Sequence, residues 1–206
     1  MKENNIHSEL ASIRSLMERS SKFLSLSGLS GVMAGIYALI GAFIGYRIVY
    51  EKYGSLVISD SYTDQPMVYN QLFLIAGVIL LLSVLTCIRL SIRQAKKKGE
   101  NFWNPVSRRL LSSMAIPLIT GGVFIIILLL RTEYDLIASA CLLFYGLSLI
   151  SASQYTFSDV KWLGFCQIIL GLLAALIPGS GPLFWVIGFG LLHIIYGSVM
   201  HFKYNR

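Results

Sequence analysis

The chain has 206 residues, of which 55% are hydrophobic and only 13% are charged, and its formal net charge is +7. Soluble domains carry about 25% charged residues, so these few charges could not cover this much apolar side chain in water. The composition therefore excludes a soluble fold and predicts an all-α integral membrane protein. We assign the positive charge to loops that face anionic lipid, and we expect no nucleic-acid partner.

Residues 1–22 form a polar and charged segment that precedes the first apolar run. Ile6, Leu10, Ile13 and Met17 recur at steps of four, three and four, which places them on one helix face. We predict a cytoplasmic amphipathic helix that lies on the lipid surface, or that packs against a partner or a second copy. Because no cleavage site follows it, the first apolar run should remain as a spanning helix.

Six apolar runs follow, and we predict a polytopic six-transmembrane-helix bundle over residues 23–206. The expected spans are residues 23–46, 71–90, 105–131, 136–154, 162–177 and 183–202. The second span should continue as a helix to Lys98 and stop at Gly99. Asn104 and Pro105 predict an N-cap and a first-turn proline that open the third span.

The long outer loop, residues 47–70, should contain an extended segment over residues 57–63 that Pro66 ends. Gly31 and Gly35 in the first span have GxxxG spacing, which favours a central place in the bundle. A kink is predicted at Pro117 in the third span.

The Lys and Arg residues predict the orientation. Residues 89–109 alone hold seven of the 17, the predicted inner segments hold 14, and the outer segments hold three. The positive-inside rule then places both termini in the cytoplasm, in the inner (plasma) membrane of a bacterial cell. Five of these residues form what we call the basic patch, namely Lys96, Lys97, Lys98, Arg108 and Arg109. We interpret this patch as a signal that sets the topology, or alternatively as a docking site for an acidic partner or anionic lipid.

The first, third and fifth spans share a basic-aromatic-or-leucine opening, namely Lys22-Phe23-Leu24, Arg109-Leu110-Leu111 and Lys161-Trp162-Leu163. This recurrence suggests three parallel two-helix hairpin repeats. The alternative is that every inner boundary favours the same residue types, so that the resemblance reflects no duplication.

A candidate bundle-interior site is centred on His193, near the middle of the last span, with Tyr196 one turn beyond it. A polar side chain at that depth should face the interior and find a partner. Gln167 lies on a small-and-polar stripe with Gly164, Gly171 and Ala174, and it should also point inward. The candidate site also includes a small and kinked part of the third span that could receive a neighbouring helix or a ligand, namely Pro117, Gly121 and Gly122. For His193 and Gln167, structural hydrogen bonding is the alternative to a functional role.

Catalytic and cofactor chemistry finds no support in the sequence. No Asp or Glu lies deep in a predicted span, and no metal-ligand spacing joins the three histidines. The three cysteines, Cys87, Cys141 and Cys166, lie in apolar runs and behave as small hydrophobic side chains. We therefore expect no catalytic residues, no cofactor and no metal, and we regard an intramembrane enzyme as the least supported class.

Two functions remain. The first is the binding or permeation of a small solute through the bundle. The second is a non-catalytic accessory or sensory subunit that contacts a cytoplasmic or membrane partner, or a second copy of the chain. A polar interior that holds His193 and Gln167 favours the first function, and a dry interior favours the second.

Overall fold

The structure is a computed structural model that describes residues 22–23, 27–53 and 66–204. The predicted amphipathic helix over residues 1–22, apart from its last residue, and the predicted extended segment over residues 57–63 lie outside the described residues. The described part is helical and contains no strand.

Two layers of helices make up the described bundle, and five of its helical segments are long and apolar enough to cross a membrane. The sixth, α6, has 17 residues and is shorter than the others. The elements in order are α2 (Gly28–Tyr53), α3 (Pro66–Lys97), α4 (Pro105–Leu130), the 3-10 turn η2 (Tyr134–Leu136), α5 (Ile137–Ala152), α6 (Val160–Leu176), α7 (Gly181–Trp185), the π-helical η3 (Val186–Leu192) and α8 (His193–Tyr204).

The outer surface of the bundle is apolar, as expected of helices that face lipid. Leu74, Leu80 and Leu81 of α3 are each more than 60% exposed. A soluble protein rarely shows such a continuous apolar surface. The all-helical class is therefore confirmed for the described residues, and five of the helices suit a membrane protein, although the count of six crossings is not confirmed.

The helix ends at the connection between α3 and α4 agree with the signals in the sequence. Asn104 caps α4 by accepting a hydrogen bond from the Ser107 backbone N–H (2.8 Å), and the Ser107 hydroxyl accepts from the Asn104 N–H (2.9 Å), which completes a capping box. Gly99 follows α3 with a φ of +68°, as a helix stop requires.

The predicted outer loop over residues 47–70 is wrong at both of its ends. Helix α2 continues to Tyr53, and α3 begins at Pro66 rather than after it. Proline suits the first turn of a helix because its missing N–H has no helical partner there. Helix α4 is continuous through Pro117, and the kink expected there stays a prediction.

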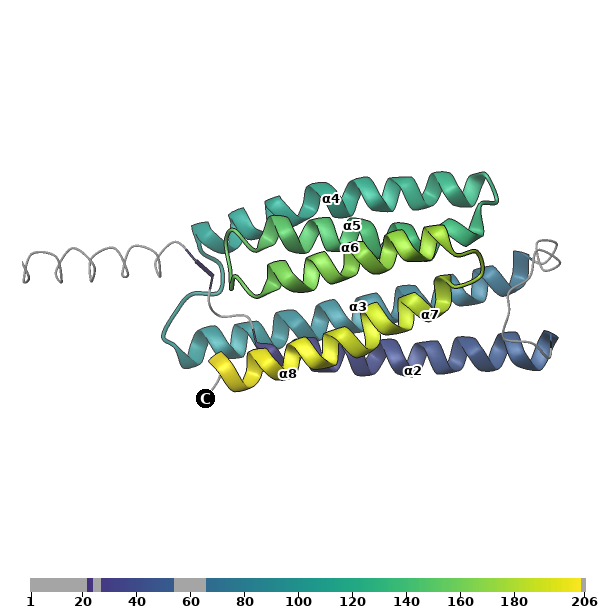
Figure 1. Cartoon of the computed structure of the whole chain (residues 1–206). Coiled ribbons are helices and arrows are strands. Elements are labelled where there is room, and N and C mark those ends of the chain that lie inside the picture. Colours follow the sequence, from purple (N-terminus) through teal and green to yellow (C-terminus); the bar gives the residue numbers. More distant parts are fainter. Residues whose placement is uncertain (1–21, 24–26, 54–65, 205–206) are drawn as a thin grey trace, which may run out of the picture.

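The helices form two layers (Figure 1). Helices α4, α5 and α6 lie side by side in one layer, with α5 in the middle, and α3, α2 and α8 form the other, with α2 in the middle. We call these the α5 layer and the α2 layer. The last helical segment, α7–η3–α8, starts beside α5 and α6 and ends beside α2, so that it joins the two layers.

Within the α5 layer, glycine brings the backbones of α5 and α6 into contact. A Cβ added at Gly146 would lie 2.7 Å from the Gly164 carbonyl oxygen, and a Cβ at Gly164 would lie 2.8 Å from the Gly146 oxygen. The Ser139 hydroxyl donates to the Gly171 carbonyl at 2.6 Å farther along the same interface. Small residues allow this approach where no hydrophobic effect drives helix pairing.

The α2 layer uses the same device between α2 and the final helical segment. A Cβ at Gly197 would lie 2.5 Å from the Val32 backbone nitrogen, and a Cβ at Gly35 would lie 2.7 Å from the Gly190 carbonyl oxygen. The prediction that the glycine-rich first span packs closely inside the bundle is supported by these contacts.

The hairpin repeat is not confirmed. Helices α2 and α3 pair with each other, as do α4 and α5, but α6 packs mainly on α5 and α8 packs mainly on α2. Aligning Lys22 of the first span with Arg109 of the third pairs Gly35 with Gly122, and these two glycines have different surroundings. Gly35 meets the η3–α8 backbone, whereas a Cβ at Gly122 would meet nothing within 4 Å.

These glycine contacts generate a stability prediction. Gly197→Ala should destabilise the protein by about 1–3 kcal/mol, because the new methyl group would overlap the α2 backbone. Gly122→Ala is the matched control, and it should be neutral or stabilising by up to about 1 kcal/mol, because glycine weakens an open helix position. Reversible unfolding of both purified variants in detergent measures the two effects. Equal stability of the two variants would contradict the backbone contact.

Candidate functional site: the polar seam between the layers

His193 is buried at the junction between η3 and α8, with 6% of its surface exposed. Its Nδ1 lies 2.9 Å from the Gly188 carbonyl oxygen, and its Nε2 lies 2.8 Å from the Tyr145 hydroxyl of α5. A carbonyl can only accept, so Nδ1 carries a proton, and in the neutral ring Nε2 accepts from Tyr145. The predicted inward orientation of His193 is confirmed, and its partner comes from the opposite layer.

Gln167 of α6 is fully buried and joins the same cluster. Its Nε2 donates to the Gly188 carbonyl at 2.8 Å, so that this one oxygen accepts from both Gln167 and His193. The other amide atom, Oε1, is buried without a hydrogen-bond partner. A Cβ at Gly188 would lie 2.6 Å from that Oε1, so only glycine permits this approach.

The π-helical η3 aligns these groups. Its wider turn places Gly188 against the α5 layer, beside Leu142 and Gln167, and Gly190 against Leu39 of α2. Such π-helical insertions are frequent at functional sites. The cluster of His193, Tyr145, Gln167 and Gly188, which we call the His193 cluster, lies on this insertion.

Between the His193 cluster and the end of α8, large apolar side chains separate the two layers. They form one buried group, against which Tyr145, Tyr196 and Tyr204 pack. Its members are Leu149, Phe157, Val160, Leu163 and Met200. The Tyr196 hydroxyl is buried and has no hydrogen-bond partner. We call this zone, from the His193 cluster to Tyr204, the seam.

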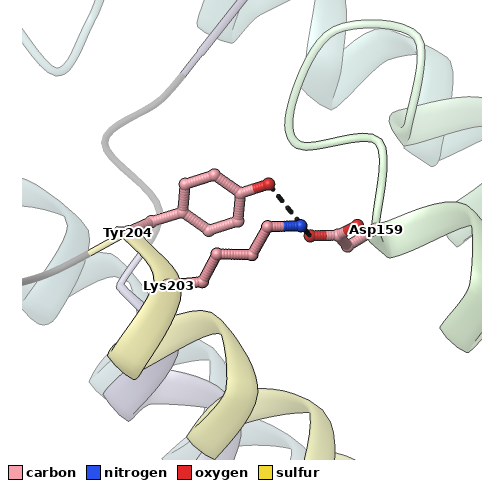
Figure 2. A network of polar contacts seen from close by, with 3 residues as sticks. All are labelled: Asp159, Lys203 and Tyr204. Carbon is pink, nitrogen blue, oxygen red and sulfur yellow. Dashed lines mark hydrogen bonds and ion pairs between the residues drawn. The ribbon is translucent and has the colours of Figure 1, made fainter.

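A polar latch closes the seam at its basic end (Figure 2). Asp159 precedes α6, and its Oδ2 accepts from Lys203 Nζ at 2.8 Å and from the Tyr204 hydroxyl at 2.9 Å. The Lys203 ammonium beside Asp159 holds the pKa of that carboxyl below its usual range, and the hydrogen bond from Tyr204 adds to this. The latch connects the end of α8, in the α2 layer, with the turn between α5 and α6.

A surface pocket of about 510 Å³ adjoins the latch, and its lining includes Lys22, Lys98, Glu100, Ser158 and Tyr204. The basic patch lies at this end of the bundle, where α3 ends and α4 begins, and its side chains are exposed. We call this the basic end. Phe23 is buried there, and its backbone is held by Tyr155 and Thr156 of the α5–α6 connection (2.7 and 2.8 Å).

The remaining members of the predicted site do not join the His193 cluster. Gly121 of α4 is buried against the Phe144 ring of α5, and Gly122 is exposed. Pro117 lies within α4, which packs on α5 rather than on the final helical segment. Tyr196 lies in the seam, below the cluster.

Sequence reasoning missed three contributors, namely Tyr145, Gly188 and Asp159. Tyr145 and Asp159 act through residues 48 and 44 positions away, so that no local spacing connects them to their partners. Gly188 accepts from Gln167, 21 positions away, and from His193, five positions away, and a glycine carbonyl carries no sequence signal of its own. The Ser148 hydroxyl of α5 donates to the Met114 carbonyl of α4 at 3.3 Å. A paired Gly188 and Gly190 next to His193 was the one signal that a special turn was present.

The three cysteines are free thiols, and within the described residues no group of three or more His, Cys, Asp or Glu could hold a metal ion. What the seam offers is neutral hydrogen-bonding chemistry. It contains an imidazole, an amide, a backbone carbonyl and hydroxyl groups.

The His193 hydrogen bond generates a second prediction. Tyr145→Phe should destabilise the protein by about 1–3 kcal/mol, because it leaves a buried imidazole nitrogen without a partner. The control is Tyr37→Phe, which removes a longer hydroxyl contact to Thr86 (3.3 Å) and should cost about 1 kcal/mol or less. Equilibrium unfolding in detergent compares them, and a loss as large in the control would rule out a special role for the imidazole contact.

The latch generates a third prediction, on pH dependence. The folded state lowers the Asp159 pKa, so the stabilisation is present above the usual aspartate pKa of about 3.9 and is lost as the pH falls through the folded value. Asp159→Asn should therefore lower Tm at neutral pH, and the difference from the unmodified protein should vanish in acid. Asp135→Asn, at an exposed carboxylate in η2, serves as the control and should leave Tm unchanged. A difference that persists at low pH would show that the latch acts otherwise.

Comparison with known proteins gives no guide to this site. A scan against protein-family models, a search of curated proteins and a search of solved structures found no match. The functional argument therefore depends on the residues of the seam and on their surroundings.

Proposed function

We propose that the chain binds a small, neutral, hydrogen-bonding solute in the seam and lets it cross the membrane between the two layers. The observation that carries this proposal is a pair of buried polar atoms without partners, Gln167 Oε1 and the Tyr196 hydroxyl. Gln167 shares the Gly188 carbonyl with His193, and Tyr196 lies one helical turn after His193 in α8. A buried polar group without a partner costs about 1–3 kcal/mol, which a bound solute would offset.

The architecture supports movement at this boundary. Backbone contacts at glycine hold each layer together, whereas larger side chains fill the space between the layers. Transporters commonly place their sites between two helix bundles that move against each other. The contacts of His193 and Gln167 are with neutral groups, which favours a neutral solute over an ion.

The proposal includes a topology. Helix α6, with 17 residues, is counted as a sixth crossing because that length is at the lower limit for a spanning helix of about 17–25 residues. The excess of Lys and Arg places the basic end in the cytoplasm of a cell with a plasma membrane. Both termini and the latch would then lie on the cytoplasmic side.

The second candidate is an accessory or sensory subunit. Two observations favour it. The basic patch is exposed at one end together with Trp103, which is 63% exposed, and both ring nitrogens of His193 are already hydrogen-bonded within the protein. In that function the His193 cluster would be structural, and the basic patch would contact an acidic partner.

Solute flux into proteoliposomes distinguishes the two functions. Vesicles with the full chain are mixed with urea, glycerol or acetamide, and swelling is followed by light scattering. We expect at least one probe to enter about ten-fold faster than into empty vesicles, a barrier difference of about 1.4 kcal/mol. Gln167→Leu should abolish the gain, whereas Gln154→Leu, at an exposed residue of the α5–α6 connection, should retain it. Flux of all three probes at the rate of empty vesicles would overturn the proposal in favour of the accessory subunit.

A further inference from the structure

The surface pocket at the basic end is formed by segments of both helix layers. Its volume of about 510 Å³ lies within the range of about 300–1,000 Å³ that is usual for small-molecule sites. The α2 layer contributes Lys98 and Glu100, at the end of α3, and Tyr204 of α8, whereas residues 156–158 belong to the connection between α5 and α6. Lys22 completes the lining. A ligand in this pocket would therefore contact both layers.

The end of α3 fixes two charged residues of the lining. The helix finishes in a Schellman motif, in which the Glu100 N–H donates to the Ala95 carbonyl at 2.9 Å. Gly99 makes the turn between Lys98 and Glu100 with a φ of +68°. Because Ala95 is almost fully buried, this turn holds the backbones of Lys98 and Glu100 against the bundle, while both side chains are exposed.

Lys22 is held on the pocket by the residue that follows it. Phe23 is buried, its N–H donates to the Tyr155 carbonyl at 2.7 Å, and its carbonyl accepts from the Thr156 hydroxyl at 2.8 Å. Thr156 itself lines the pocket. The backbone next to each of the two lysines is therefore anchored, so that the two ammonium groups reach one pocket from distant parts of the sequence.

The charges of the lining favour an anion with one negative charge. Lys22 and Lys98 are opposed by one carboxylate, that of Glu100, which leaves one net positive charge. Asp159 lies beside the pocket, but its charge is balanced by Lys203 at 2.8 Å. A lysine ammonium is a compact charge with several N–H donors and suits phosphate oxygens. One net charge matches a phosphodiester better than a phosphate monoester, which carries about −1.5 to −2 at pH 7.

The remaining lining residues suit the other parts of a phospholipid headgroup. The exposed Ser158 hydroxyl can donate to phosphate, and Phe157 is buried and apolar. The Tyr204 hydroxyl already donates to Asp159 (Figure 2), so its oxygen is left to accept from a ligand hydroxyl. The carboxylate of Glu100 is likewise an acceptor for hydroxyl groups.

Exposed tryptophans place the pocket near the depth of lipid headgroups. Trp103, in the connection between α3 and α4, is 63% exposed, and Trp162, in the first turn of α6, is 70% exposed. Tryptophan is enriched at the membrane–water interface, where its amphipathic ring lies at the headgroup level. The basic patch at the same end would attract anionic lipid to this surface.

We propose that the pocket at the basic end binds the phosphodiester headgroup of an anionic phospholipid. Lys22 and Lys98 donate to the phosphate oxygens, and Glu100 accepts from a hydroxyl of the headgroup. The bound lipid joins α3 and α8 to the connection between α5 and α6, and it therefore stabilises the contact between the two layers. This site is separate from the His193 cluster and does not rest on solute passage.

The test is a titration of the full chain, purified in an uncharged detergent, with dioctanoyl phosphatidylglycerol at constant ionic strength. A ligand that binds only the folded state raises Tm, so we expect a saturable rise, followed by tryptophan fluorescence. The double variant Lys22→Gln/Lys98→Gln should need about ten-fold more lipid for half of the rise, because it loses charge-assisted hydrogen bonds to phosphate. The matched control Lys96→Gln/Lys97→Gln removes two charges outside the lining and should respond like the unmodified protein.

Two further ligands separate the headgroup from its parts. Dioctanoyl phosphatidylcholine, which has the same phosphodiester but no net charge, should give no saturable rise. Sodium phosphate at the same concentrations should leave Tm unchanged. A rise with phosphate equal to that with phosphatidylglycerol would identify free phosphate as the ligand and overturn the lipid site, and equal rises with the two lipids would overturn the preference for an anion.

Two other outcomes would also overturn the proposal. One is the lack of any saturable rise with phosphatidylglycerol. The other is an equal loss of response in the control double variant, which would indicate general attraction to the basic patch rather than a pocket. Native mass spectrometry of the same samples counts bound lipid directly, so the comparison holds even if a variant begins from a lower Tm. One phosphatidylglycerol should remain on the unmodified protein and be lost from Lys22→Gln/Lys98→Gln.

Discussion

Contact between helix backbones at glycine is the constraint on which the rest of this structure depends. Where Gly146 meets Gly164, and where Gly197 meets α2, two helices lie closer than any side chain would allow. Lipid tails solvate leucine as well as a neighbouring helix does, so such close packing has to stabilise the pairs. This close backbone packing stabilises the helix pairs within each layer. Between the layers, larger and more polar side chains make the contacts.

The polar seam follows from that division. The final helical segment belongs to both layers, and its π-helical part lies where it changes from one to the other. There, one carbonyl, that of Gly188, receives hydrogen bonds from Gln167 of α6 and from His193. Tyr145 then extends the connection to α5. Polar groups in hydrocarbon need partners, so this cluster is also what specifies how the layers meet.

The candidate site was predictable in part. His193 and Gln167 could be selected because an isolated polar side chain deep in an apolar helix must face inward, and both are buried. This argument could not place the other three candidates, Pro117, Gly121 and Gly122. Proline and glycine do not specify which helix lies next to them. In the structure these residues belong to α4, which packs on α5 and not on the His193 cluster. Tyr145 was overlooked because tyrosine is common near membrane interfaces and its partner lies 48 residues away.

The sequence by itself determined the helical membrane class, most helix boundaries and the gathering of basic residues at one end, because these depend on local composition, caps and hydrophobic length. Only the tertiary structure decided which helices pair, because glycine on a helix face permits many partners. It also decided that Val186–Leu192 is π-helical and that Asp159 meets Lys203 and Tyr204. These features arise from contacts between segments distant in the chain, whose free energies no local pattern encodes.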